Sequence, residues 1–207
     1  YNSVTIAGLA AVICGILGLT IGYAVVRLQG GWLAGFLRQV SFLPYLMPAM
    51  AFAAAFLTLF AVPRGPVPAL YGSISLLVLV MVVTYLPYAS RSGISAMTQV
   101  GREPEEAAMV LGAGFFSRML RIMGPLQRTA LVTAIILPFI SGMKELSLVV
   151  MLVTPGTEML TTQSLRFLDY GFTQLANATI LIIGVVVMLM VLLLQRITKS
   201  NLAGGLG

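Results

Sequence analysis

Residues 4–26 read VTIAGLAAVICGILGLTIGYAVV, and this uncharged apolar stretch decides the fold class. An α-helix rises about 1.5 Å per residue, so the stretch is long enough to cross the ~30 Å hydrocarbon core of a bilayer. Four more apolar runs of comparable length follow, at residues 40–62, 70–88, 129–153 and 172–194. None of them alternates apolar and polar residues as the strands of a membrane barrel do. The sequence therefore predicts an all-α, polytopic membrane protein, a helical bundle with five transmembrane helices.

The composition excludes most soluble classes of protein. Of the 207 residues, 59 % are hydrophobic and only 9 % are charged, whereas a soluble domain has about 25 % charged residues. A soluble enzyme, a disordered chain or a nucleic-acid-binding protein in water could not cover its surface with so few charges. The absence of histidine excludes imidazole metal sites and histidine-based acid–base catalysis. The single cysteine, Cys14, has no partner for an internal disulfide, and we predict neither a catalytic residue nor a resident metal.

The positive charges lie mainly on one side of the predicted membrane. The segments after the first, third and fifth runs carry nine cations: Arg27, Arg38, Arg91, Arg102, Arg118, Arg121, Arg128, Arg196 and Lys199. The segments after the second and fourth runs carry only Arg64 and Arg166. Because cytoplasmic loops of membrane proteins are enriched in Lys and Arg, the first group is assigned to the cytoplasm. The N-terminus of the chain is then expected outside, and the C-terminus in the cytoplasm.

Glycines recur at nearly four-residue spacing within residues 4–26. They are Gly8, Gly15, Gly18 and Gly22. Small residues at this spacing let two membrane helices approach closely, so we expect these glycines to pack against a neighbouring helix.

The segment 101–125 is more polar than its surroundings and predicts a compact cytoplasmic element. Pro104 with Glu105 and Glu106 suits the first turn of a helix, because proline lacks an N–H and the helix dipole favours acids there. A short helix is predicted over residues 105–111, ended by Gly112 and Gly114, since glycine adopts the left-handed cap conformation easily. The apolar residues that follow have helical spacing and are expected to pack back on the bundle: Phe115, Phe116, Met119, Leu120 and Ile122.

The same segment contains a motif of fixed spacing. Its positions are Glu106-Ala107-Ala108, Gly112 after three residues, Ile122 after nine more, and then Gly124-Pro125. This resembles the EAA loop of binding-protein-dependent ABC importer permeases, E-A-A-x3-G-x9-I-x-L-P. Gly124 departs from the usual leucine of that pattern.

The resemblance implies a type I ABC importer permease whose short cytoplasmic helix is a coupling helix. It assigns ATPase coupling to Glu106, Ala107, Ala108 and Gly112, with supporting packing by Ile122 and Pro125. It further implies alternating access in the bacterial inner membrane. The implied partners are a nucleotide-binding subunit that binds ATP and Mg, a second permease module, an extracytoplasmic solute-binding protein and membrane lipid, but no nucleic acid. The chain has no G-x-x-x-x-G-K-[ST] phosphate-binding loop of its own, so we expect no cofactor in it.

The transported substrate is suggested by a second, shorter resemblance. Met143-Lys144-Glu145-Leu146, with Thr154-Pro155-Gly156 after it, resembles the ferric-iron and thiamine branch of these permeases. Ferric iron is the expected substrate on this basis. Thiamine, polyamine, phosphonate and molybdate or sulfate stay open, because those branches share the fold and the loop.

Lys144 and Glu145 fall inside the predicted span 129–153. Charges in hydrocarbon are costly, so such residues usually face a bundle interior or a water-filled path. One interpretation places both residues in the translocation path or its outer gate; the other is an interfacial pair that reaches the headgroups. Pro138 could let this span bend during gating, or could be a static kink.

Two other classes of protein stay open from the residues alone. An ion-coupled secondary transporter would need an intramembrane acid, for which Glu145 is the candidate. A membrane scaffold without transport is the other class. We interpret residues 1–207 as a single transmembrane permease domain, and the start at Tyr1 as the sign of a piece of a longer chain.

Overall fold

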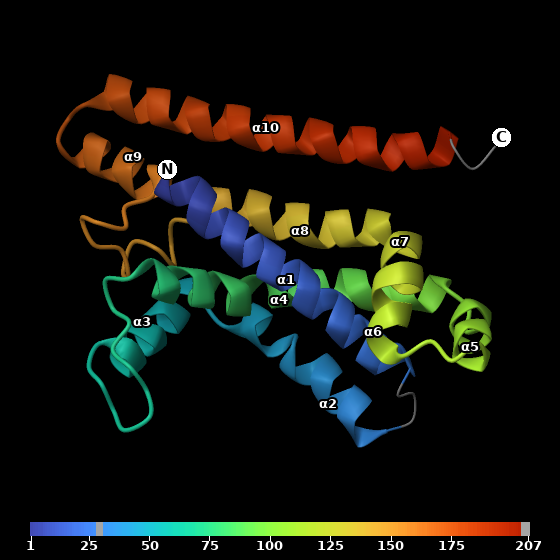
Figure 1. Ribbon diagram of the computed structural model, residues 1–207. Helices are drawn as coiled ribbons and strands as arrows, with labels where there is room; N and C mark the ends of the chain where they lie inside the picture. Colours follow the sequence, from blue (N-terminus) through green and yellow to red (C-terminus); the bar gives the residue numbers. More distant parts are fainter. Residues whose placement is uncertain (28–30, 204–207) are drawn as a thin grey trace.

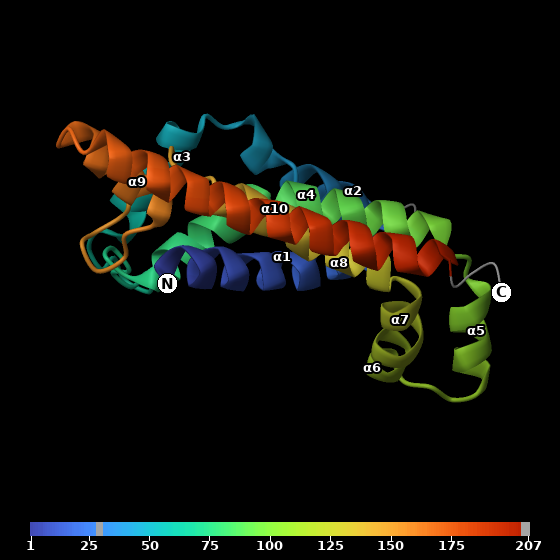
Figure 2. The same cartoon turned by 90° about the horizontal axis from the view of Figure 1, so that it is seen from above.

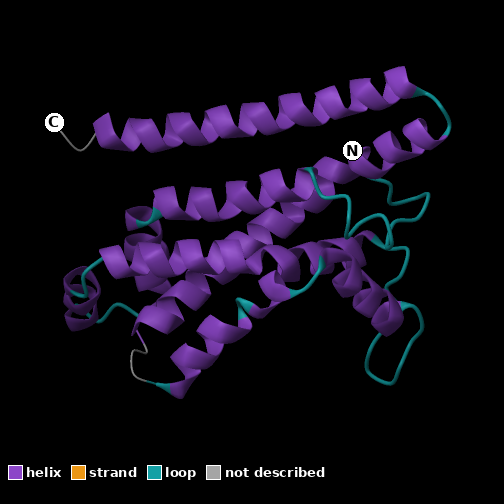
Figure 3. Cartoon of the chain, turned by 180° about the vertical axis from the view of Figure 1, so that it is seen from behind, coloured by secondary structure: helices purple, strands orange, loops and turns teal. Residues whose placement is uncertain are grey.

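The computed structural model describes residues 1–27 and 31–203 and is a bundle of helices (Figure 1). Three helices are long and apolar enough to cross a membrane: α1 (Asn2–Arg27), α4 (Ile74–Gln99) and α10 (Thr173–Ala203). The number rises to five if each of two bent helix pairs counts as one span. In the described residues, regular structure other than helix is limited to one isolated bridge between Arg64 and Val67 (Figure 3). The all-α membrane fold predicted from the apolar runs is therefore confirmed.

The centre of the bundle is the crossing of α1 and α4, with α8 (Arg128–Met143) packed against both. A Cβ atom on Gly22 would lie 2.3 Å from the carbonyl carbon of Gly93, and one on Gly18 would lie 2.5 Å from the carbonyl group of Ala89. The two backbones are thus in direct contact. The expectation of close packing is confirmed for Gly18 and Gly22, and for Gly15, which packs against Ile135 of α8, and it is wrong for Gly8, around which nothing lies within 4 Å.

The second predicted span, residues 40–62, is not one straight helix. It is replaced by α2 (Trp32–Val40), the 3₁₀ turn η1 (Leu43–Leu46) and α3 (Ala49–Phe60). The part before residue 47 and α3 meet at 105°. Pro44 is the second residue of η1 and Pro48 is the N-cap of α3, and neither can donate a backbone hydrogen bond. Met47 before Pro48 is extended, as the proline ring requires of its predecessor.

The fourth predicted span, residues 129–153, is also shorter than expected. The helix α8 ends at Met143, and Lys144 is its C-cap, so the expectation that Lys144 and Glu145 lie inside a continuous helix is wrong. The backbone here finds other partners. The Glu145 carboxylate accepts the N–H of Leu148 at 3.0 Å, and its carbonyl accepts the Thr161 hydroxyl at 2.7 Å. Such side-chain bonds compete with helix continuation.

Irregular chain then leads to α9 (Leu160–Asp169), a helix that the sequence does not predict. Beyond α9, the chain turns back into α10, which lies on the outside of the bundle and packs on α9 and α8 (Figure 1). The apolar part of α10 is mostly exposed within this chain, as a lipid-facing helix would be.

The segment between α4 and α8 projects from one end of the bundle (Figure 2). It consists of α5 (Glu103–Val110), α6 (Phe115–Arg118), the π-helical turn η2 (Met119–Met123) and α7 (Gly124–Leu126). An 81° bend separates it from α8. We call this end of the bundle the loop end. The C-terminal end of α10 also lies here, whereas the N-terminus lies at the opposite end (Figures 1 and 2).

The crossing of α1 and α4 predicts a strong difference between two glycines of one helix. Gly22→Ala forces a methyl group into the backbone of α4, and we expect it to destabilise the solubilised protein by about 1–3 kcal/mol. Gly8→Ala meets open space and is the matched control. Thermal unfolding in detergent should show a lower midpoint for Gly22→Ala alone. Equal midpoints would mean that the close contact does not support the fold.

Candidate functional site

The projecting segment begins with α5, on which the motif residues divide between two faces. Glu106 and Ala107 are exposed, whereas Ala108 is buried against the rest of the segment. Gly112 ends the element with a φ of +78°, and no atom lies within 4 Å of where its Cβ would be. Gly112 is therefore required by its backbone conformation, not by space. The expectation that Gly114 also ends α5 in a left-handed conformation is wrong. Gly114 is the N-cap of α6 and is extended, with a φ of −67°.

The carboxylate that holds α5 in place is Glu105, which is only 5 % exposed. Its Oε2 lies 3.0 Å from Nε of Arg27, and its Oε1 lies 3.5 Å from Nε of Arg118. The hydroxyl of Tyr23 donates to Oε1 at 2.5 Å. One side chain thus joins α5 to the end of α1 and to α6. Arg27 adds a second link, because its Nη2 donates to the carbonyl of Gly101 at 3.0 Å.

Sequence reasoning missed this cluster. Three acids stand close together at 103, 105 and 106, and nothing in their order says which of them is buried. A buried carboxylate needs charged or hydrogen-bonding partners, and here they come from a helix about 80 residues earlier. The available signal was the pair Tyr23 and Arg27, one helical turn apart at the end of the first run.

The base of the projecting segment packs on the bundle through apolar side chains. Met123 is buried against Val26 of α1 and Met97 of α4, with Ile122 half-buried at the same place. Pro125 is exposed and lies in the first turn of α7. The segment therefore sits on the ends of the two helices that cross at the centre of the bundle.

The projecting segment exposes several large apolar side chains, which we together call the loop patch. Its members are Met109, Val110, Leu111, Phe115, Phe116 and Leu120, exposed between 46 % and 88 %. The expectation that Phe116 and Leu120 pack back on the bundle is wrong, since they are 78 % and 75 % exposed. Large exposed apolar side chains beside exposed charges mark an interaction surface.

A second polar group lies toward the opposite end. The Glu145 carboxylate accepts the hydroxyl of Tyr85 at 2.5 Å and is half-buried between α4 and the chain after α8. Lys144 next to it is exposed, and it forms no ion pair with any carboxylate in residues 1–27 and 31–203. The two adjacent charges therefore do not pair. Tyr85, buried in α4, is a partner that sequence reasoning did not identify.

Pro138 is buried in the middle of α8, which continues through it without a break. The sharp bend in this part of the chain lies at Gln127, between α7 and α8. The described residues contain no group of three or more His, Cys, Asp or Glu side chains that could hold a metal ion.

Comparison with known proteins gives a family match over nearly the whole chain. The family described as "Binding-protein-dependent transport system inner membrane component" matches residues 5–201. The chain is 28 % identical over 209 residues to the ferric transport system permease protein FbpB of Actinobacillus pleuropneumoniae, covering 97 % of this chain. It spans only 29 % of the length of that protein.

A second relative is named for a different transported substrate. The probable sulfate transport system permease protein cysT of Prototheca wickerhamii is 26 % identical over 203 residues, which cover 91 % of this chain and 79 % of the relative. Among solved structures, a bacterial ABC transporter involved in the import of the acidic polysaccharide alginate has a similar fold, with a TM-score of 0.76 and 14 % identity. The match covers 96 % of this chain and 77 % of that chain.

The Glu105 cluster predicts that one carboxyl group controls the order of the projecting segment. Glu105→Gln leaves two arginines without a counter-charge, so local unfolding of residues 103–126 should become easier by about 3 kcal/mol. Hydrogen exchange in that segment should then be accelerated about 100-fold. Glu106→Gln, an exposed neighbour on the same helix, should leave exchange unchanged. Equal exchange in the two variants would contradict the anchoring role of Glu105.

Proposed function

Because this chain belongs to the family of binding-protein-dependent transport system inner membrane components, we propose that it is the permease part of an ABC importer. The observation that carries the proposal is the presentation of α5 at the loop end. There, exposed Glu106 and Ala107 stand on a short helix held to the bundle by the buried Glu105. Such a helix is suited to receive work from a separate subunit.

The loop patch is the surface through which an ATPase subunit would dock. Ala107 is small and exposed, so a partner can approach the α5 backbone closely, and the carboxylate of Glu106 is free to pair with a partner cation. Exposed side chains such as Leu111 and Phe116 supply apolar area for the same interface. Gly112 supplies the left-handed turn that ends α5 between these groups.

A push on α5 would reach the bundle along two connections. The first is the Glu105 carboxylate, which bonds to Tyr23 and Arg27 at the end of α1. The second is the packing of Met123 between α1 and α4. Since these two helices are in backbone contact, they are expected to move as one body. Movement of this body against a second permease module would provide alternating access.

At the opposite end, Lys144, Glu145 and Pro138 are the proposed elements of the path or its outer gate. The hydrogen bond from Tyr85 to Glu145 fastens the chain after α8 to α4, and exposed Lys144 offers a cation beside it. Because Pro138 cannot donate to its preceding turn, α8 has one fewer bond resisting a bend there. The charge asymmetry supports an assignment of this end to the outer side of the bacterial inner membrane, where a solute-binding protein would dock.

Ferric iron is the substrate we propose, supported by the similarity to a ferric transport permease over 97 % of this chain. The sulfate relative makes sulfate the competing substrate. The partners proposed are an ATPase subunit that binds ATP and Mg, a second permease module and an extracytoplasmic binding protein. Hydrolysis of ATP would then take place in the partner chain.

The coupling role predicts different outcomes for two neighbouring glycines. Gly112→Val forces a β-branched residue into a positive φ, whereas Gly114→Val enters an extended position with open space around it. In the complex assembled in lipid, Gly112→Val should lose binding-protein-stimulated ATP hydrolysis and uptake by about tenfold or more. Gly114→Val should keep both.

Assembly with the ATPase, measured by co-purification, separates lost docking from lost coupling. If both variants transport as well as the wild type, and if transport does not require an ATPase partner, the importer proposal is wrong. A self-sufficient transporter built around Glu145 would then be the better hypothesis.

The substrate proposal is tested by uptake into proteoliposomes that contain the complete transporter. With a ferric-binding protein and ATP inside, labelled ferric iron should accumulate, whereas labelled sulfate with a sulfate-binding protein should not. Accumulation of sulfate in place of iron would contradict the assignment while leaving the permease function intact.

A further inference from the structure

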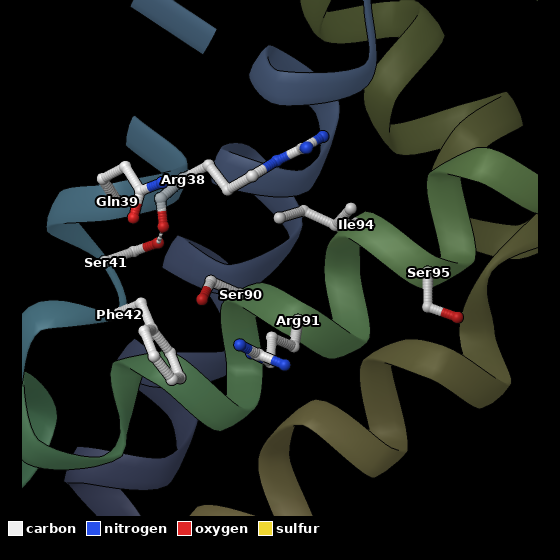
Figure 4. A pocket seen from close by; sticks show the side chains of 8 residues that line it. All are labelled: Arg38, Gln39, Ser41, Phe42, Ser90, Arg91, Ile94 and Ser95. Atoms are coloured by element: carbon white, nitrogen blue, oxygen red, sulfur yellow. Dashed lines mark hydrogen bonds between the residues drawn. The ribbon is translucent and has the colours of Figure 1, made fainter. Parts of the chain in front are cut away.

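A basic pocket lies between α2 and α4, toward the loop end. It has a volume of about 550 Å³, and Figure 4 shows Arg38 on α2 and Arg91 on α4 among the residues that line it, with the Arg91 guanidinium on the side of Phe42. Ser41, Ser90 and Ser95 also line it, although the hydroxyls of Ser41 and Ser90 donate to the backbone carbonyls of Arg38 and Pro87. Among the residues that the structure describes, no acidic side chain lines it. The pocket is therefore suited to an anion that carries several oxygen atoms.

The two arginines have no counter-charge of their own. In residues 1–27 and 31–203, neither guanidinium forms an ion pair with a carboxylate. Arg91 lies over the ring of Phe42, 4.3 Å from its centroid, which orients the guanidinium without neutralising it. Both side chains are exposed, so a negative charge from outside this chain can reach them.

An apolar groove adjoins the basic pocket. It has a volume of about 410 Å³ and is lined by side chains such as Leu37, Val40, Phe56 and Leu86. Ser41 lines both hollows, and it is the one polar residue in the wall of the groove. The surface therefore offers a cationic site and a hydrocarbon site side by side, as a ligand with a charged head and an apolar tail requires.

The position of α2 agrees with a membrane interface. Its residues Trp32, Phe36 and Val40 are exposed by 80 %, 54 % and 47 %, whereas Arg38 belongs to the pocket. Tryptophan is enriched at the headgroup level, and short amphipathic helices lie along it. The charge asymmetry assigns the loop end to the cytoplasmic leaflet, where basic pockets between membrane helices bind anionic headgroups.

We propose that this surface binds an anionic phospholipid, with its phosphate between Arg38 and Arg91 and an acyl chain in the adjoining groove. A free oxyanion would leave the apolar groove empty. A second copy of the same surface would bring the two cations of one chain against the two of the other. A phospholipid would occupy both sites, with its headgroup in the pocket and an acyl chain in the groove. It would thereby connect the broken span, α2 to α3, to α4.

Binding is tested on the assembled transporter in detergent by native mass spectrometry, independently of transport. The probes are phosphatidylglycerol and phosphatidylcholine with identical acyl chains, and inorganic phosphate as the headgroup alone. We expect phosphatidylglycerol to be retained at least tenfold more than phosphatidylcholine. In the double variant Arg38→Gln/Arg91→Gln this preference should be lost, a fall of about tenfold or more, so that phosphatidylglycerol is retained at the level of phosphatidylcholine.

Three variants guard against misfolding and non-specific charge effects. Arg196→Gln removes an exposed cation at the same end of the bundle, outside the pocket, and should change retention less than twofold. Arg38→Lys/Arg91→Lys keeps the charges and should keep most of the preference. Val40→Trp fills the groove from an exposed position and should weaken retention of phosphatidylglycerol with both arginines present.

Several results would overturn the proposal. Equal retention of the two lipids, or an unchanged preference in Arg38→Gln/Arg91→Gln, would show that the pocket does not select an anionic lipid. Displacement of phosphatidylglycerol by millimolar inorganic phosphate would identify a site for a free oxyanion. A cross-link from Val40→Cys to a second permease module would show that another chain covers the groove.

Discussion

The close contact between α1 and α4 is the constraint on which the rest of this structure depends. Gly18 and Gly22 bring the two backbones together over Ala89 and Gly93, at distances that admit no further methyl group. Membrane helices gain little from a hydrophobic effect in lipid, so such backbone contact is a main source of their association. The projecting segment follows α4 and rests on the end of α1, and the chain after α8 is tied to α4. The projecting segment and the chain around Glu145 are therefore both attached to the closely packed pair of helices α1 and α4.

The two ends are fastened by the same chemistry. At the loop end Tyr23 of α1 donates to Glu105, and toward the opposite end Tyr85 of α4 donates to Glu145, both at 2.5 Å. Glu105 also has two arginine partners, which suits a fixed joint. Glu145 has hydrogen bonds but no ion pair among the described residues, which suits a contact that opens and closes at lower cost. This difference fits the proposed alternating access, in which one end is held and the other opens.

The exposed apolar surfaces of this chain differ in the kind of molecule that is expected to cover them. The loop patch stands beyond the end of the bundle beside the free charge of Glu106, so a protein partner is the expected cover. The part of α10 over Thr173–Leu193 is apolar and mostly exposed within this chain, as a helix in contact with lipid tails is. The surface around Arg38 and Arg91 has a cationic pocket beside an apolar groove. The proposed occupant, an anionic lipid, likewise has a charged headgroup and an apolar tail.

The sequence by itself determined what depends on local composition. Uncharged runs such as residues 4–26 specify membrane helices, and Gly112 ends α5 because a positive φ needs glycine. Tertiary structure decided what depends on partners far away in the chain. The burial of Glu105 is set by Tyr23 and Arg27, and α8 ends early because the groups around Glu145 bond elsewhere. A backbone or carboxylate group chooses its partner by proximity in space, and a linear pattern does not contain that proximity.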